Sequence, residues 1–195
     1  RMAVDYGMSL GFQANDLIVA LLITQFVGFP SALLFGKLGQ KWSVRKSIYV
    51  AIAIYMAVTV WGTMMTNKQE FYILAIIIGF VQGGIQALSR SYYARLIPLN
   101  QAAEFYGFYN MLGKFAAIFG PALMGIVGLI ARRMLMPPAP TPEQIEQVGQ
   151  LASRWGIGSI LILFTVGAIL FYFVDEEKGK EEAAYLSQAS SQDLS

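Results

Sequence analysis

The stretch IIIGFVQGGIQALSRSYYARLIP, residues 76–98, joins an apolar run to a row of polar side chains. Its first half is as apolar as a membrane-spanning helix requires. Gln82, Gln86 and Arg90 then follow at intervals of four residues, and Pro98 ends the segment. Because residues four apart share one face of a helix, the pattern predicts a transmembrane helix with one polar stripe.

A second stripe on the same helix consists of the small residues Gly79, Gly83 and Ala87. It lies about 100° around the helix from the polar stripe, at 3.6 residues per turn. Small residues let membrane helices approach closely. We therefore expect one stripe to pack against a neighbouring helix and the other to line a wet space.

The composition supports a membrane protein. Of 195 residues, 56% are hydrophobic and 13% are charged, and the mean hydropathy is +0.53, whereas soluble domains carry about 25% charged residues. The chain has no histidine and no cysteine, which removes His-based metal sites, Ser-His-Asp triads and thiol chemistry. We expect no metal and no cofactor. A net charge of only +2 and the lack of a known nucleic-acid-binding motif also argue against a nucleic-acid partner.

The hydrophobic runs divide the chain into three parts. Residues 1–15 are expected to form the outer end of a truncated helix plus a loop. Residues 16–174 form a five-span bundle in the lipid bilayer, with an external Pro-rich loop at 132–154. Residues 175–195 form a charged cytoplasmic tail that is disordered beyond a first turn or two. The expected spans, each about 20 apolar residues long, are Asp16 to Gly36, Ser47 to Met65, Phe71 to Ile97, Glu104 to Ala131 and Trp155 to Val174.

Two local signals give the orientation and one further helix start. The loop of residues 36–47 carries four basic side chains and no acid, which predicts a cytoplasmic loop by the positive-inside rule. The C-terminus is then cytoplasmic and the N-terminus external. Thr141 followed by Pro142 is typical of a helix start, so a surface helix is expected after the proline-rich segment.

Two other spans carry comparable stripes. The first span has the small residues Gly28, Ala32 and Gly36 at intervals of four, with Gln25 near mid-depth. The fourth span has a polar row, Tyr106, Asn110 and Lys114, and a small edge that includes Gly120. Polar stripes on three helices favour a shared aqueous cavity.

Lys114 is the most informative of these residues. It lies about 15 Å along its helix, where an unpaired lysine costs at least ~2.5–3.5 kcal/mol. One interpretation is that Lys114 faces a polar cavity and meets a substrate carboxylate or an acid on another helix. The other is that it extends to the cytoplasmic interface. The same alternatives apply to Arg90, and the glutamines are either cavity lining or hydrogen-bonding links between helices.

Two motifs then suggest a family. The sequence GKLGQKWSVRKS, residues 36–47, resembles the G-x-L-x-D-R-x-G-R-K loop of the major facilitator superfamily, although Gln40 replaces the acid and Ser43 the glycine. The stretch GGIQALSRSYYARLIP, followed by AEFYGFYNMLGKFAAIFGPALMG, resembles the vacuole-effluxer-like branch of that superfamily, the autophagy-related amino-acid effluxers. The residues that match the loop signature are Gly36, Leu38, Lys41, Arg45 and Lys46.

This resemblance implies an all-α integral membrane fold. The five spans would be helices eight to twelve of a twelve-helix transporter, with residues 3–12 as the end of helix seven. The chain would thus be the C-terminal six-helix half with its first helix truncated, and its partner would be the missing N-terminal half. We expect a multi-pass protein of a bacterial inner membrane.

Three functions are conceivable for a chain with these features. The first is half of a secondary transporter that works by alternating access and exports or moves a small-molecule substrate, which the resemblance suggests to be small amino acids or similar solutes. The second is a membrane scaffold or assembly subunit without a water path. The third, an intramembrane enzyme, is disfavoured because no histidine, cysteine or paired acids lie at depth.

Overall fold

The computed structural model describes residues 13–41 and 43–192, and every regular element in these ranges is helical. Five membrane-length helical stretches are present, the last formed by two consecutive helices. The expected all-α fold with five spans is confirmed, whereas the expected end of a further helix at residues 3–12 lies outside the described residues. The elements are α2 (Ala14–Lys41), α3 (Val44–Met64), α4 (Lys68–Ala94), the 3₁₀ turn η1 (Leu99–Gln101), α5 (Ala102–Leu135), α6 (Pro142–Gly158), α7 (Ile160–Tyr172) and α8 (Glu176–Gln192).

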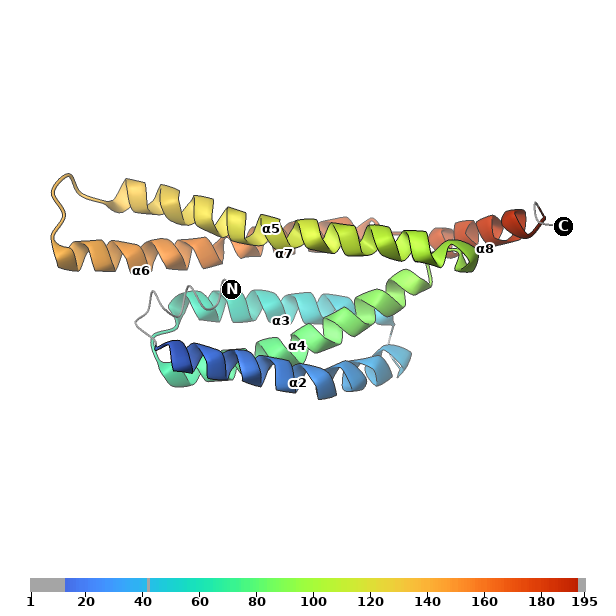
Figure 1. Cartoon of the computed structure of the whole chain (residues 1–195), viewed down its shortest axis with the longest axis horizontal. Helices are drawn as coiled ribbons and strands as arrows, with labels where there is room; N and C mark the ends of the chain where they lie inside the picture. Colours follow the sequence, from blue (N-terminus) through green and yellow to red (C-terminus); the bar gives the residue numbers. More distant parts are fainter. Residues whose placement is uncertain (1–12, 42, 193–195) are drawn as a thin grey trace.

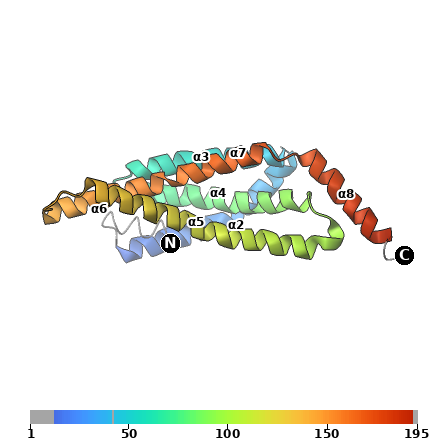
Figure 2. The same ribbon diagram turned by 90° about the horizontal axis from the view of Figure 1, so that it is seen from above.

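The spans form two layers (Figure 1). Helices α2, α3 and α4 make one layer, and α5, α6 and α7 make the other, with η1 joining α4 to α5. The layers meet where α3 packs on α6 and α7. Seen from above, α8 leads away from the bundle at the end where α7 finishes (Figure 2).

The α2–α4 crossing depends on glycine. A Cβ atom on Gly79 would lie 2.5 Å from the carbonyl oxygen of Thr24, and one on Gly83 would collide with the backbone of Gly28. The Thr24 hydroxyl also donates a hydrogen bond to the carbonyl of Ala75 (3.2 Å), and the Ser31 hydroxyl donates to the carbonyl of Phe80. Backbone contact through small residues lets two helices pack closely in lipid.

The packing face of α2 differs in part from the expected small edge. Gly36 is exposed, and a Cβ atom there would meet no described atom within 4 Å, so Gly36 takes no part in the α2–α4 crossing. Four residues turn a helix by about 400°, so a strict interval of four drifts away from a straight contact. Ser31 and Phe35 are the buried residues there, and Gly39 lies against Leu88.

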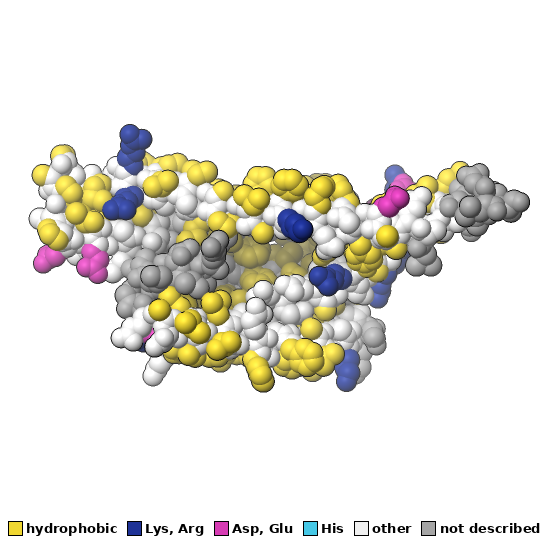
Figure 3. Space-filling model, in the orientation of Figure 1, with side chains coloured by type: hydrophobic (Ala, Val, Ile, Leu, Met, Phe, Trp, Pro, Cys, Tyr) yellow, Lys and Arg dark blue, Asp and Glu magenta, His cyan; other side chains and the backbone are white. Residues whose placement is uncertain are grey.

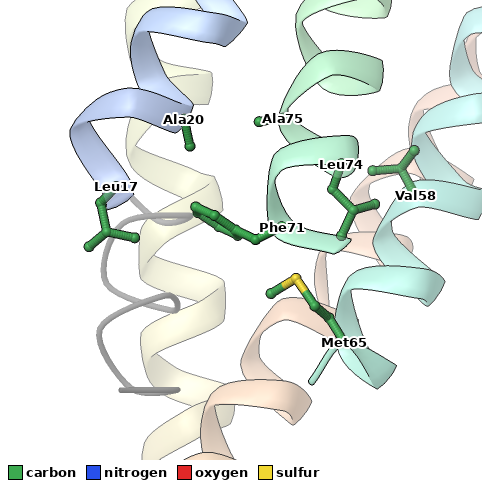
Figure 4. Packing of buried hydrophobic residues seen from close by; sticks show 7 residues of the cluster. All are labelled: Leu17, Ala20, Val58, Met65, Phe71, Leu74 and Ala75. Carbon is green, nitrogen blue, oxygen red and sulfur yellow. The ribbon is translucent and has the colours of Figure 1, made fainter. Parts of the chain in front are cut away.

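Two buried apolar clusters hold the first layer together. One lies at the end where α3 connects to α4 (Figure 4), and the other lies at the opposite end of the same helices. By contrast, Gly120 is the buried residue of α5, and none of the described α7 residues is buried. Most of the second layer's apolar surface is thus available to lipid or to other protein. The first cluster contains Leu17, Ala20, Val58, Met65, Phe71, Leu74 and Ala75, and the second contains Phe35, Val44, Ile48, Leu88 and Tyr92.

The segment at 132–154, expected as an external loop with a helix start at Thr141 and Pro142, is mostly helical, and that helix start is confirmed. Helix α5 continues to Leu135, and α6 begins at Pro142, so only residues 136–141 connect them. Thr141 forms a capping box, because its hydroxyl accepts from the Gln144 backbone N–H (3.3 Å) while the Gln144 side chain accepts from the Thr141 N–H (3.0 Å). The resulting helix buries Val148 and packs on α5. This packing adds to the stability that the hydrogen bonds within the helix provide.

The C-terminal tail also differs from expectation. It is helical from Glu176 to Gln192, where the composition predicts disorder beyond a first turn or two. The Asp175 carboxylate accepts from the backbone N–H groups of Glu177 and Lys178 at 3.1 and 3.2 Å, which satisfies donors at the helix start. Glu176 and Lys180 form an ion pair one turn apart. These local contacts, which composition alone does not reveal, favour the helix.

Candidate functional site

The first cavity, of about 320 Å³, lies between α2 and α4. Its polar lining consists of Gln25 from α2 and of Gln82, Gln86 and Arg90 from α4, together with Thr24. The remaining lining residues are small or apolar, and they include the glycines of the α2–α4 crossing. The close approach of the two backbones therefore forms the floor of the cavity, and the amides form its polar wall.

A second cavity, of about 490 Å³, lies between α4 and α5. Gln86 and Arg90 line it from α4, and Asn110 and Lys114 line it from α5. Because Gln86 and Arg90 line both cavities, the two spaces adjoin along the polar stripe of α4. Figure 3 shows a hollow between the two layers, with basic side chains along its rim.

The structure thus brings together all six polar residues singled out in the sequence. Lys114, Asn110, Arg90, Gln86 and Gln25 are exposed in this chain, and Gln82 is half-buried. Side chains that are exposed in the middle of membrane helices require water, a ligand or other protein as partners. Lys114 lies about 18 Å from the first residue of α5 and roughly 7 Å from the helix midpoint, at 1.5 Å per residue.

A tyrosine cluster connects α4 to α5 beside the second cavity. The Tyr93 hydroxyl donates to the carbonyl of Phe105 (2.9 Å), and the Tyr109 hydroxyl donates to Ser89 Oγ (3.2 Å). The Tyr93 and Tyr109 rings lie 4.9 Å apart, centroid to centroid. Tyr106 extends the cluster, since its hydroxyl donates to the carbonyl of Arg90 (3.4 Å). These contacts fix how the start of α5 faces the end of α4.

Sequence reasoning missed part of this cluster. Tyr93 reads as an interfacial aromatic residue, and Tyr109 and Ser89 carry no signal of their own. The available hint was the interval of four between Ser89 and Tyr93, which places a hydroxyl and an aromatic ring on one face of α4. Their partners on α5 lie about 12 to 20 residues further along the chain, beyond the reach of helix periodicity.

The loop signature lies apart from both cavities. The Arg45 guanidinium donates to the carbonyl of Tyr172 at 2.6 Å and lies over the Phe171 ring, 5.9 Å from its centroid. Arg45 thus connects the start of α3 to the end of α7. Lys46 is exposed, and the side chains of Leu38 and Lys41 lie outside the described residues.

Five membrane-length helical stretches, together with polar side chains that line cavities between them, define a multi-pass membrane protein with an internal polar site. Residues 6–132 match the family described as "Vacuole effluxer Atg22 like". The chain belongs to this family. No solved structure is significantly similar to it.

Individual relatives agree with this assignment. The chain is 38% identical, over 176 residues, to the Uncharacterized MFS-type transporter YxiO of Bacillus subtilis (strain 168), and the match covers 90% of this chain and 37% of that protein. It is 27% identical, over 182 residues, to Autophagy-related protein 22 of Yarrowia lipolytica, covering 89% of this chain and 28% of that protein. The chain therefore spans about a third of the length of these relatives.

Proposed function

We propose that the chain is part of a secondary transporter that moves a small solute across the membrane. The observation that carries this proposal is the pair of adjoining cavities, because all six polar candidates from three helices line them. The names of the relatives support it, since one is an MFS-type transporter. The family description, which names an effluxer, also agrees with transport.

In this proposal the chain supplies one half of a transporter that works by alternating access. The rest of the transporter would cover the exposed sides of α2 and α5 and complete the site. The cytoplasmic side would be the end with η1 and α8, and the membrane would be a bacterial inner membrane. Small amino acids or similar solutes are the substrate class that the family resemblance favours.

The residues have separate roles in this proposal. Gln25, Gln82 and Gln86 offer both amide donors and carbonyl acceptors, so they suit a solute with mixed polar groups. Asn110 adds a fourth amide from α5. The glycines at the α2–α4 crossing keep the first cavity narrow, and the tyrosine cluster sets the width of the second.

The direct test is flux through the full-length protein in liposomes, measured for a panel of labelled amino acids with and without a proton gradient. Saturable flux above that of protein-free liposomes is expected for at least one of them. A second measurement separates transport from a scaffold role: cysteines at positions 82, 86, 110 and 114 should react with water-soluble thiol reagents. No flux together with four unreactive cysteines would favour the scaffold.

A further inference from the structure

We propose that Arg90 and Lys114 form an oxyanion subsite within the second cavity, so that the transported solute carries a carboxylate or a phosphate group. The inference rests on the proposed function and specifies its substrate class. The two cations line one space from two different helices. An anion between them would contact both helices at once.

The charge balance of the cavity is the first argument. Its lining contains two cations and no carboxylate: Gln86, Arg90, Tyr109, Asn110, Gly113, Lys114 and Ala117. Neither Arg90 nor Lys114 takes part in an ion pair among the residues that the structure describes, where the ion pairs are Lys68–Asp16 and Lys180–Glu176. Two cations that line one space repel each other, and desolvation within a membrane strengthens that repulsion. A bound anion would relieve both costs.

The arrangement on the two helices is the second argument. On α4, Gln86 precedes Arg90 by one turn, and on α5, Asn110 precedes Lys114 by one turn. Each helix therefore offers an amide and a cation on one face. The connection through η1 makes α4 and α5 antiparallel, so Lys114 lies further than Asn110 from the cytoplasmic end, whereas Arg90 lies nearer to it than Gln86. At 1.5 Å per residue, the two amides thus lie at a depth between those of the two cations.

The tyrosine cluster is the third argument, because it fixes the register of these donors. Tyr106 reaches the carbonyl of Arg90 itself, and Tyr109 lines the cavity while its hydroxyl is bonded to Ser89. These bonds hold the part of α5 that precedes Asn110 against the part of α4 that carries Arg90. Preorganised donors bind an anion with less loss of conformational freedom.

The first test measures the charge of the cavity without knowledge of the substrate. Ala117, which lines the cavity, is changed to cysteine in a full-length protein without other cysteines. The ratio of its reaction rates with an anionic and a cationic methanethiosulfonate of similar size is then determined. We expect the ratio to fall about tenfold when Arg90→Gln and Lys114→Gln are combined, as the loss of two charges within roughly 10 Å implies.

A cysteine at Thr141, in the short connection between α5 and α6, is the matched control, and its ratio should not change. Size-exclusion profiles confirm that each variant remains folded, and the single variants replace the double variant if it aggregates. An unchanged ratio at position 117, or a cysteine there that reacts with neither reagent, would overturn the subsite.

The second test uses transport and separates this inference from the proposed function. Liposomes with the full-length protein are offered alanine, alaninamide and phosphoserine as competitors against whichever labelled solute is carried. We expect alanine or phosphoserine to compete at least tenfold better than alaninamide, which lacks a free oxyanion group, and Lys114→Gln to remove the preference. Better competition by alanine identifies the carboxylate, whereas better competition by phosphoserine, which carries both groups, identifies the phosphate. Flux with equal competition by all three overturns the subsite alone, whereas the absence of flux for the whole panel overturns the proposed function with it.

Discussion

The Asp16 carboxylate lies 2.6 Å from the Lys68 ammonium, and the Tyr72 hydroxyl donates to the same carboxylate at 3.1 Å. This contact joins the first turn of α2 to the first turns of α4. It lies at the opposite end of α4 from Arg90. The α2–α4 pair is therefore fastened by charge at one end and by backbone contact at the glycines in the middle.

Asp16→Asn should weaken this attachment only modestly, because exposed ion pairs are screened by solvent. We expect a small fall in the thermal midpoint of the purified full-length protein, and a smaller fall at high salt. Lys68→Gln should add little in the Asp16→Asn background, since the pair is already broken. Additive effects of the two substitutions would show that the residues act independently.

Gly83→Ala should destabilise the protein by about 1–3 kcal/mol, as overpacking typically does. The added methyl group would meet the backbone of Gly28, which is not free to move aside as a side chain would be. Gly167→Ala is the matched control, because a Cβ atom on Gly167 would meet no described atom within 4 Å. Thermal unfolding in detergent compares the two. Equal midpoints would remove Gly83 from the packing interface.

Lys114→Met should abolish or strongly weaken transport by the full-length protein and leave it folded and inserted. Methionine keeps the apolar length of the side chain without its charge. Lys114→Arg should restore transport only in part, because the planar guanidinium is larger and points its donors differently. Flux is measured with equal amounts of the three proteins. Normal flux in Lys114→Met would mean that the lysine extends to the interface.

Tyr109→Phe should cost about 0.5–1.5 kcal/mol of stability, the typical net value of one hydrogen bond. The phenylalanine ring keeps the contact with Tyr93 but loses the bond to Ser89. Ser89→Ala should cost a similar amount, and the double variant should cost little more than either single one. Unfolding measurements on all three check this coupling. Full additivity would argue against the bond.

Reporters inserted at Gln40 and Gln188 should both lie in the cytoplasm, and one at Gln147 should lie outside. The prediction follows from the basic residues of the loop at 36–47 and from the odd number of spans between that loop and α6. Reporter activity in intact cells provides the measurement. An external reporter at Gln40 would reverse the orientation of every span.

Hydrophobic runs predicted the spans and helix periodicity predicted the polar stripe of α4, but neither predicted contacts between helices. The stripe of Gln82, Gln86 and Arg90 follows from intervals of four within one helix, so it needs no knowledge of the neighbours. Gly36, which takes no part in the α2–α4 crossing, shows the limit, since the direction of α4 relative to α2 decides which residues of α2 it meets. The partners of the Tyr93 and Tyr109 hydroxyls depend on how η1 turns the chain.

The first residues of α6 and α8 show another limit of the sequence analysis. Hydropathy finds where lipid begins, but it does not find where a helix ends. Helix α6 starts well before the apolar segment because Thr141 and Gln144 cap it. Helix α8 starts at a charged sequence because Asp175 satisfies its first N–H groups. The motif of Thr141 and Pro142 predicted the first of these starts, whereas the second depends on hydrogen bonds to one carboxylate, which an average over composition cannot detect.

Gln86 and Arg90 face both cavities, and this shared wall bears on the height of the barrier to movement. A polar solute that leaves one binding space for another normally loses all its partners before it gains new ones. Here it would exchange only the residues of α2 for those of α5, while its contacts with α4 persist. In the proposed transporter, movement between the two cavities would then be a stepwise substitution of hydrogen-bond partners, with the contacts to α4 kept throughout.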